Sequence, residues 1–221
     1  MTPDHIRTEI DRLIAELLST GLAMDSNPST VASPERNLRI ATWVRYRPTT
    51  ELAFTTVEEY RWFVENRQYN LILFDGSLLQ ITYKFRRREL VEHRLCYYPC
   101  PFHLDREEWE MYQEMGLGLL DLLEDFSLEE FQGHLRLRSP IRFDFDLQRA
   151  GENHPASHLH LGQQHCRIPV FAPLSIGHFI RFVFGNFYPD QWADFLHKWP
   201  CERLGRTITA GQGRRLHLNC T

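Results

Sequence analysis

The feature that most constrains the fold of this sequence is a hairpin pattern in its first half. Asp75-Gly76 separates two runs of strand-forming residues, 69–74 and 77–85. An Asp-Gly pair between such runs favours a tight turn, because both residues tolerate the positive φ values that the turn requires. The second run alternates strictly between apolar and polar residues, which predicts one buried face made of Leu79, Ile81, Tyr83 and Phe85.

A third run, 89–99, extends this hairpin into an antiparallel sheet. The arginine cluster 86–88 is predicted to form the turn before it. Pro99 and Pro101 end the third strand, because proline cannot donate a ladder hydrogen bond. A sheet with one apolar face needs helices or a second sheet to cover that face.

The rest of the chain alternates between helical and strand patterns. Helices are predicted for 3–22, 55–67, 105–134 and, as a pair around Tyr188-Pro189, for 173–199. Further strands are predicted for 37–46, 141–147, 157–162 and 166–170, whereas the polar, turn-rich segment 25–36 is predicted to be a loop. The predicted fold class is α+β, a mainly antiparallel sheet flanked by N-terminal and C-terminal helices. We expect a single domain over 1–221, with helix 3–22 and loop 25–36 at its periphery.

The overall charge argues against the simplest type of nucleic-acid-binding protein, which is strongly basic. The formal net charge is −4 over 221 residues, so contact with nucleic acid would need a local basic patch. Such a patch would be formed by Lys84 and Arg86–Arg88 together with Arg94, or with Arg136 and Arg138. The simpler interpretation of the same residues is a solvated hairpin tip.

No segment of the sequence predicts export or insertion into a membrane. The N-terminal run is amphipathic and charged throughout, unlike a signal peptide. No stretch approaches the ~18 uninterrupted apolar residues of a membrane span. The five cysteines are scattered, which indicates reduced thiols and not a disulfide framework. We therefore expect a cytoplasmic protein without a membrane partner.

The strongest candidate for a chemical site comes from the polar faces of two predicted strands. Strict alternation in 141–147 puts its polar residues on one face, and the run 157–162 does the same with two histidines. The intervening loop of about ten residues is long enough to make the two strands neighbours. The shared face would hold Arg142, Asp144, Asp146, His158 and His160, with His154 in the loop between them.

Three kinds of chemistry fit these residues, and so does a structural role. A divalent metal could be held by His158, His160 and a carboxylate. A metal-free ribonuclease could use one histidine as base and another as acid, with Arg142 steadying a phosphate. A carboxylate could also orient a histidine by accepting its ring N–H. The structural alternative is a solvated sheet face on which arginine and aspartate pair across strands. His93, on the strand 89–99, either joins this cluster or lies in the core.

The C-terminal third of the chain resembles an uncharacterised prokaryotic family of unknown function. The similar elements are the RFD strand at 142–144, the HPxxHLxxG pattern at 154–162, CRIP at 166–169 and NFYP at 186–189. This resemblance implies a bacterial cytosolic protein and supplies no activity.

A looser resemblance connects the chain with TumE-like toxins of toxin–antitoxin pairs. Those proteins also show hairpin strands, then an Arg-x-Asp strand, then a histidine-rich segment. The resemblance implies a catalytic role for Arg142, Asp144, His154, His158 and His160. This chain departs from the pattern in its greater length, its additional helices and the spacing of its histidines.

Two functional hypotheses follow from the sequence. The first is an enzyme that cleaves nucleic acid, such as a toxin or a phage-defence effector, with a site built from the Asp and His cluster. The second is a non-catalytic partner or adaptor subunit of a toxin–antitoxin or phage-defence operon, which would use exposed aromatic residues of 109–123 or 179–199 to bind a protein partner.

Overall fold

The computed structural model describes residues 1–48, 57–103, 107, 111–112, 114–116, 118–119, 121, 134–136, 138–163, 165–192 and 199–219. Its helices are α1 (Pro3–Ser19), α2 (Val57–Glu65), α6 (Ile176–Phe187), α7 (Pro189–Trp192) and the short 3-10 helix η2 (Gln212–Arg214). Its strands are β1 (Ala23–Ser26), β2 (Ser29–Glu35), β3 (Leu38–Trp43), β4 (Leu71–Leu73), β5 (Leu78–Arg86), β6 (Glu89–Tyr98), β7 (Ile141–Asp146), β8 (Ser157–Leu161) and β9 (Ile168–Pro169).

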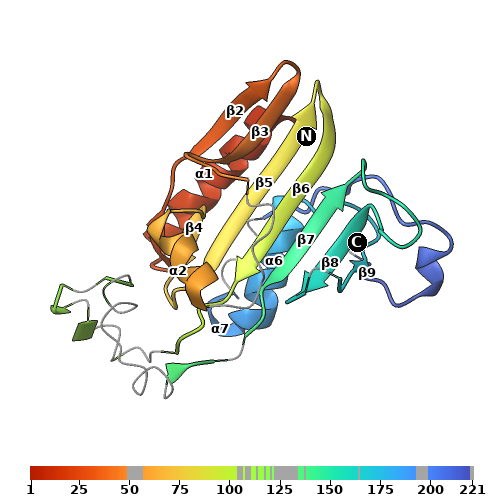
Figure 1. Cartoon of the computed structure of the whole chain (residues 1–221). Helices are drawn as coiled ribbons and strands as arrows, with labels where there is room; N and C mark the ends of the chain where they lie inside the picture. Colours follow the sequence, from red (N-terminus) through yellow and green to blue (C-terminus); the bar gives the residue numbers. More distant parts are fainter. Residues whose placement is uncertain are drawn as a thin grey trace.

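These strands form one open sheet in which every pair of named strands is antiparallel (Figure 1). The main order is β1-β4-β5-β6-β7-β8-β9. The long strand β5 has two neighbours on one side, because β4 pairs with its beginning and β3 with its end. β2 then pairs with β3. The predicted α+β class, an antiparallel sheet with helices at both ends of the chain, is confirmed.

The hairpin that the sequence predicted lies between β4 and β5. Gly76 has a φ of +80°, a value that glycine adopts without strain. The backbone N–H of Ser77 donates to the carboxylate of Asp75 at 3.0 Å, and the hydroxyl of Tyr188 donates to the other carboxylate oxygen at 2.9 Å. The turn is therefore fixed both by its own residues and by the end of α6.

The main core lies on the face of the sheet covered by α1 and α6, which Figure 1 shows behind the strands. The alternate residues of β5 predicted to be buried are all fully buried on this face. The helix α1 contributes four more buried residues, Ile6, Ile10, Leu13 and Leu17, and α6 contributes five, Ile176, Phe179, Ile180, Val183 and Phe184. Each of these large side chains stabilises the fold by about 1.5–3 kcal/mol when fully buried.

The opposite face of the sheet is covered only in part by the described residues. Helix α2 packs over the end of this face, where Tyr60 and Phe63 contact Tyr98 of β6. Beyond α2, the same face carries the polar residues of β6, β7 and β8 and is hollowed into a cavity. The partial cover is what leaves a polar site accessible on an otherwise well-packed sheet.

The prediction of a loop over 25–36 is wrong. Most of this segment forms β1 and β2. In β2, the four residues from Ser29 to Ala32 pair antiparallel with the residues from Trp43 back to Ile40 in β3. An edge strand needs no apolar face, so the polar composition of β2 is also typical of a loop and does not distinguish the two. Pro34 lies where the register shifts, a place where a strand tolerates proline. The strand is specified by its partner β3 and not by its own pattern.

Other predicted elements match where the structure describes them. The predicted helix 3–22 is α1, and the strands 37–46, 141–147 and 157–162 are β3, β7 and β8. The predicted segments 105–134 and 193–199 lie largely outside the described residues. None of the described helices has the length and the apolar character that a membrane span needs. The expectation of a single domain stays a prediction.

Candidate metal centre

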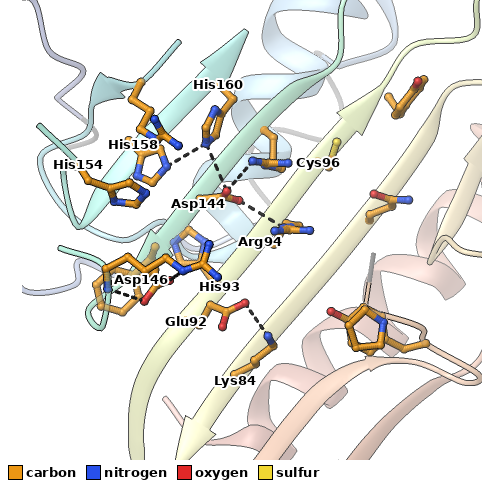
Figure 2. A pocket seen from close by; sticks show the side chains of 18 of the residues that line it. Lys84, Glu92, His93, Arg94, Cys96, Asp144, Asp146, His154, His158 and His160 are labelled. Atoms are coloured by element: carbon orange, nitrogen blue, oxygen red, sulfur yellow. Dashed lines mark hydrogen bonds and ion pairs between the residues drawn. The ribbon is translucent and has the colours of Figure 1, made fainter. Parts of the chain in front are cut away.

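The strand register brings the predicted residues into two rows across the polar face. Asp144 of β7 pairs with Arg94 of β6 on one side and with His158 of β8 on the other. Arg142, two residues earlier, pairs with His160. Figure 2 shows the two histidine rings and the Asp144 carboxylate pointing toward one another across β7 and β8. The ligand atoms of Asp144, His158 and His160 all lie within 4.8 Å of one another.

Backbone carbonyls fix the tautomers of both histidines. Nδ1 of His158 lies 2.7 Å from the carbonyl oxygen of Pro155, and Nδ1 of His160 lies 3.2 Å from that of Gln163. A carbonyl oxygen can only accept, so we assign the ring proton to Nδ1 in both residues. In each neutral ring the Nε2 atom then presents a lone pair. Histidines that bind metals are oriented in this way by a partner on the other ring nitrogen.

These two lone pairs face each other. Nε2 of His158 lies 2.9 Å from Nε2 of His160, and both side chains are buried, at 2% and 3% exposure. Two lone pairs at this distance repel unless a proton or a metal cation lies between or beside them. At a metal–nitrogen distance of about 2.05 Å, two ligands that subtend about 90° lie ~2.9 Å apart, and tetrahedral ligands lie ~3.3 Å apart. The observed separation is thus close to that of two ligands of one metal.

Asp144 supplies a third ligand atom and a negative charge. Its Oδ2 lies 3.4 Å from Nε2 of His160 and 2.9 Å from a guanidinium nitrogen of Arg142. Its Oδ1 lies 3.6 Å from Nε of Arg94. Burial alone would raise the pKa of Asp144, but the positive charges of Arg142 and Arg94 oppose that effect, and the pKa lies well below its ordinary value. The carboxylate is therefore ionised at neutral pH.

The protonation of His158 also suits a metal ligand. Burial lowers its pKa to about 4, and the attraction of Asp144 offsets only part of that effect. At neutral pH the ring of His158 is neutral and its Nε2 can accept a cation. A metal ligand must be deprotonated at the coordinating atom, so the site needs no proton release from this residue to bind a metal.

The remaining predicted residues lie around this centre. The ring of His154 meets the ring of His158 edge to face, with 4.8 Å between the ring centroids. Asp146 lies farther along β7 and accepts hydrogen bonds from the backbone N–H groups of Gln148 and Arg149, so its role is to fix the turn after the strand. His93 lies on the other face, where its Nε2 accepts from the backbone N–H of Leu174, and it belongs to the core.

The C-terminal segment braces the loop that carries His154. The buried Gln212 donates from its amide to the carbonyl oxygens of Gly151 and Glu152, at 2.9 and 3.4 Å. Gly151 in turn exchanges two backbone hydrogen bonds with His154. The position of His154 thus depends on a residue almost sixty positions later in the chain.

Sequence reasoning did not assign Arg167 or Glu59 to the site, and it considered Arg94 only as part of a basic patch. All three line the cavity beside the cluster. Arg94 could have been found from its alternation with Cys96 on β6, had the register between β6 and β7 been known. No local pattern identifies Glu59, which α2 places over this face and whose pKa burial raises to about 7.

The fold and the cluster together define an α+β protein with a buried Asp–His–His group on the polar face of an antiparallel sheet. A family model described as "Uncharacterized conserved protein (DUF2290)" matches residues 22–220, and the chain belongs to this family. No curated protein and no solved structure gives a match. The predicted resemblance to an uncharacterised family is confirmed at this level, whereas the individual motifs and the similarity to TumE-like toxins stay predictions.

Proposed function

We propose that this protein is a metal-dependent hydrolase that cleaves phosphodiester bonds of nucleic acid, with the metal held by Asp144, His158 and His160. One observation carries the proposal. Nδ1 of each histidine lies within hydrogen-bond distance of a backbone carbonyl, which leaves two Nε2 atoms and a carboxylate oxygen of Asp144 within 4.8 Å of one another. Such a set of donors suits zinc, manganese or iron.

Three protein ligands leave coordination positions for water and substrate. A divalent metal in such a site supplies a water of lowered pKa as nucleophile and polarises a phosphoryl oxygen. The guanidinium groups of Arg94 and Arg142 lie beside the same carboxylate, where they would offset negative charge that develops on the phosphate. The oxygen of the water would form the new bond to phosphorus while the bond from phosphorus to the leaving oxygen breaks, and the leaving oxygen would take up the proton that the water loses.

The cavity next to the cluster favours an anionic substrate. It has a volume of about 230 Å³. Five of its lining residues are basic and four are acidic, and a bound divalent cation would make the balance clearly positive. Tyr46 also lines it, and aromatic rings beside basic groups are a common means of holding single-stranded nucleic acid. An activity of this kind would suit a toxin or a phage-defence effector.

Metal-free acid–base catalysis is a weaker candidate for the same residues. A ribonuclease of that type needs two imidazoles on opposite sides of a phosphate. Here the Nε2 atoms of His158 and His160 are in direct contact and leave no room for a phosphate between them.

The hypothesis of a non-catalytic partner depends on exposed aromatic residues. In the described part of 179–199, Phe179, Phe184 and Tyr188 are buried and Phe187 is 41% exposed. Among the aromatic side chains of 179–199 whose burial the structure describes, Phe187 alone is exposed, and segment 109–123 lies largely outside the described residues. The described residues thus give this hypothesis less support than the cluster gives to catalysis. We therefore retain the adaptor function only as the outcome to adopt if the protein has no metal and no activity.

The test is metal binding followed by cleavage. We would strip the purified protein with EDTA and titrate Zn²⁺, Mn²⁺ and Mg²⁺ by calorimetry. The wild type should bind one metal ion per chain. The double variant His158→Ala/His160→Ala should bind it at least ~100-fold more weakly, since loss of even an outer partner costs about 10–100-fold. The control is His165→Ala, which removes an exposed histidine from the same segment.

Cleavage is then measured on mixed RNA and DNA with and without each metal. The proposal requires cleavage by the wild type and by His165→Ala, and none by the double variant. A wild type that binds no metal, or a double variant that cleaves like the wild type, would refute the assignment.

A further inference from the structure

Arg167 and His154 each bring to the cavity beside the cluster a buried polar atom that has no hydrogen-bond partner among the described residues. The two atoms are Nε of Arg167 and Nδ1 of His154. A buried polar group without a partner costs about 1–3 kcal/mol, and most such groups are satisfied in native proteins. The two groups therefore indicate a ligand that the cavity is built to hold.

Arg167 and His154 are close enough to interact electrostatically. Burial lowers the pKa of His154, and the positive charge of Arg167 lowers it further. None of the ion pairs in the described residues involves Arg167, so no carboxylate of that part of the chain neutralises its charge.

The fold places Arg167 and His154 beside the two histidines of the metal centre. Ile168 pairs with Leu159, so Arg167 stands at the register position opposite His160 on β8. His154 contacts the ring of His158, the other histidine of the centre. An anion between Arg167 and His154 would thus lie beside both histidine ligands. Figure 2 shows His154 next to His158 at the end of β8.

We propose that Arg167 and His154 form a phosphate-binding subsite beside the metal centre. The guanidinium of Arg167 donates from Nε and from its terminal nitrogens to phosphate oxygens, and His154 donates from Nδ1. A planar guanidinium is well matched to two oxygens of one phosphate. Neither group transfers a proton in this role. Binding of phosphate does not depend on catalysis, whereas the assignment of that phosphate to a nucleic-acid chain rests on the proposed function.

The subsite would determine which phosphate reaches the metal. In a nucleic-acid chain, successive phosphates are held by the same backbone, so one anchored phosphate positions its neighbour. Holding a reactant in the correct geometry lowers the barrier to the reaction by removing the entropy cost of alignment. Gln212 contributes indirectly, because it fixes the loop that carries His154.

The experiment measures inorganic phosphate binding to the full chain by ³¹P NMR titration, with the protein stripped of metal. The variants are Arg167→Gln and His154→Ala, and the control is Arg149→Gln. Arg149 lines the same cavity, but its side chain is 79% exposed and pairs with Asp146. We expect the affinity to fall about tenfold for Arg167→Gln and several-fold for His154→Ala, and to change less than about twofold for Arg149→Gln.

Several results would overturn the subsite. They are no phosphate binding by the wild type, unchanged binding in Arg167→Gln, or an equal loss in Arg149→Gln, which would indicate general attraction by charge. If Arg167→Gln does not fold, Arg167→Lys keeps the charge and loses the planar donor pair, and the subsite then requires weaker binding by Arg167→Lys. The metal titration of the wild type separates the two proposals, because phosphate binding without metal binding would retain the subsite and remove the hydrolase.

Discussion

Replacing Asp144 by Asn tests the charge arrangement on which the site depends. The substitution keeps the shape of the side chain and removes its negative charge. In the absence of metal, Arg142 then remains 11% exposed and loses its partner at 2.9 Å. Removing one partner of a buried ion pair costs about 3–5 kcal/mol, because the other buried charge loses the compensation that this partner supplied. The side chain of Arg94 is 35% exposed, so solvent screens its charge and the loss of its contact with Asp144 adds little to this cost.

The free energy of unfolding would be measured by urea titration at pH 7 with EDTA present. Asp144→Asn should lower it by about 3–5 kcal/mol. The matched control is Asp146→Asn on the same strand, whose remaining Oδ1 still accepts from the turn backbone at 2.8 Å, and it should cost less than about 1 kcal/mol.

A double-mutant cycle then isolates the pair. Arg142→Met removes the buried charge, so combining it with Asp144→Asn should restore a large part of the lost stability. Additive effects of the two substitutions, or a cost for Asp144→Asn no larger than that of Asp146→Asn, would refute the buried ion pair and with it the electrostatic description of the site.

Three further predictions concern the elements that support the site. Burial lowers the pKa of His93 to about 4 from 6.5, so the folded protein binds fewer protons than the unfolded chain and loses stability as the pH falls from about 6.5 to 4. In His93→Gln, the loss of unfolding free energy between pH 7 and pH 4 should be smaller by about 3 kcal/mol, and an unchanged pH dependence would contradict this. Gln212→Ala should increase amide hydrogen exchange of the loop around His154 while leaving the sheet protected, and equal exchange in both proteins would show that the brace is unimportant. Gly177→Ala should destabilise the fold by more than about 2 kcal/mol in a thermal melt, because a Cβ there would overlap the carbonyl oxygen of Pro200. An unchanged melting temperature would mean that α6 does not approach this segment so closely.

Local patterns predicted most of the sheet, because the signals of a strand, alternating side chains and turn residues at its ends, lie within the strand itself or next to it. Asp75-Gly76 specified a turn, and strict alternation in β5 and β7 separated a buried face from a polar face. The same reasoning failed for 25–36, since β2 is held by backbone pairing to β3 and its side chains show no alternation. Alternation also decided the face of His93, once the register of β6 showed which face was the core.

For the candidate site, the sequence predicted which residues take part, but not which residues of other strands lie beside them. The sequence alone determined that Asp144, His158 and His160 would face the same side of their strands, because side chains alternate along a strand with a period of two. It could not determine which strand lies beside β7, because β6 and β7 are separated by more than forty residues. The tertiary structure decided that Arg94 would flank Asp144, and that Arg167 would stand opposite His160.

The tertiary structure also decided the chemistry of the histidines. Composition does not distinguish a solvated His-x-His pair from a metal ligand. The contacts of both Nδ1 atoms are local, because the carbonyl groups of Pro155 and Gln163 lie three residues from His158 and His160. The tertiary structure adds the burial of both rings and the placement of Asp144 at 3.4 Å from Nε2 of His160. The physical reason is that the sequence sets which groups are present, whereas burial and hydrogen-bond partners set which of their atoms can bind a cation.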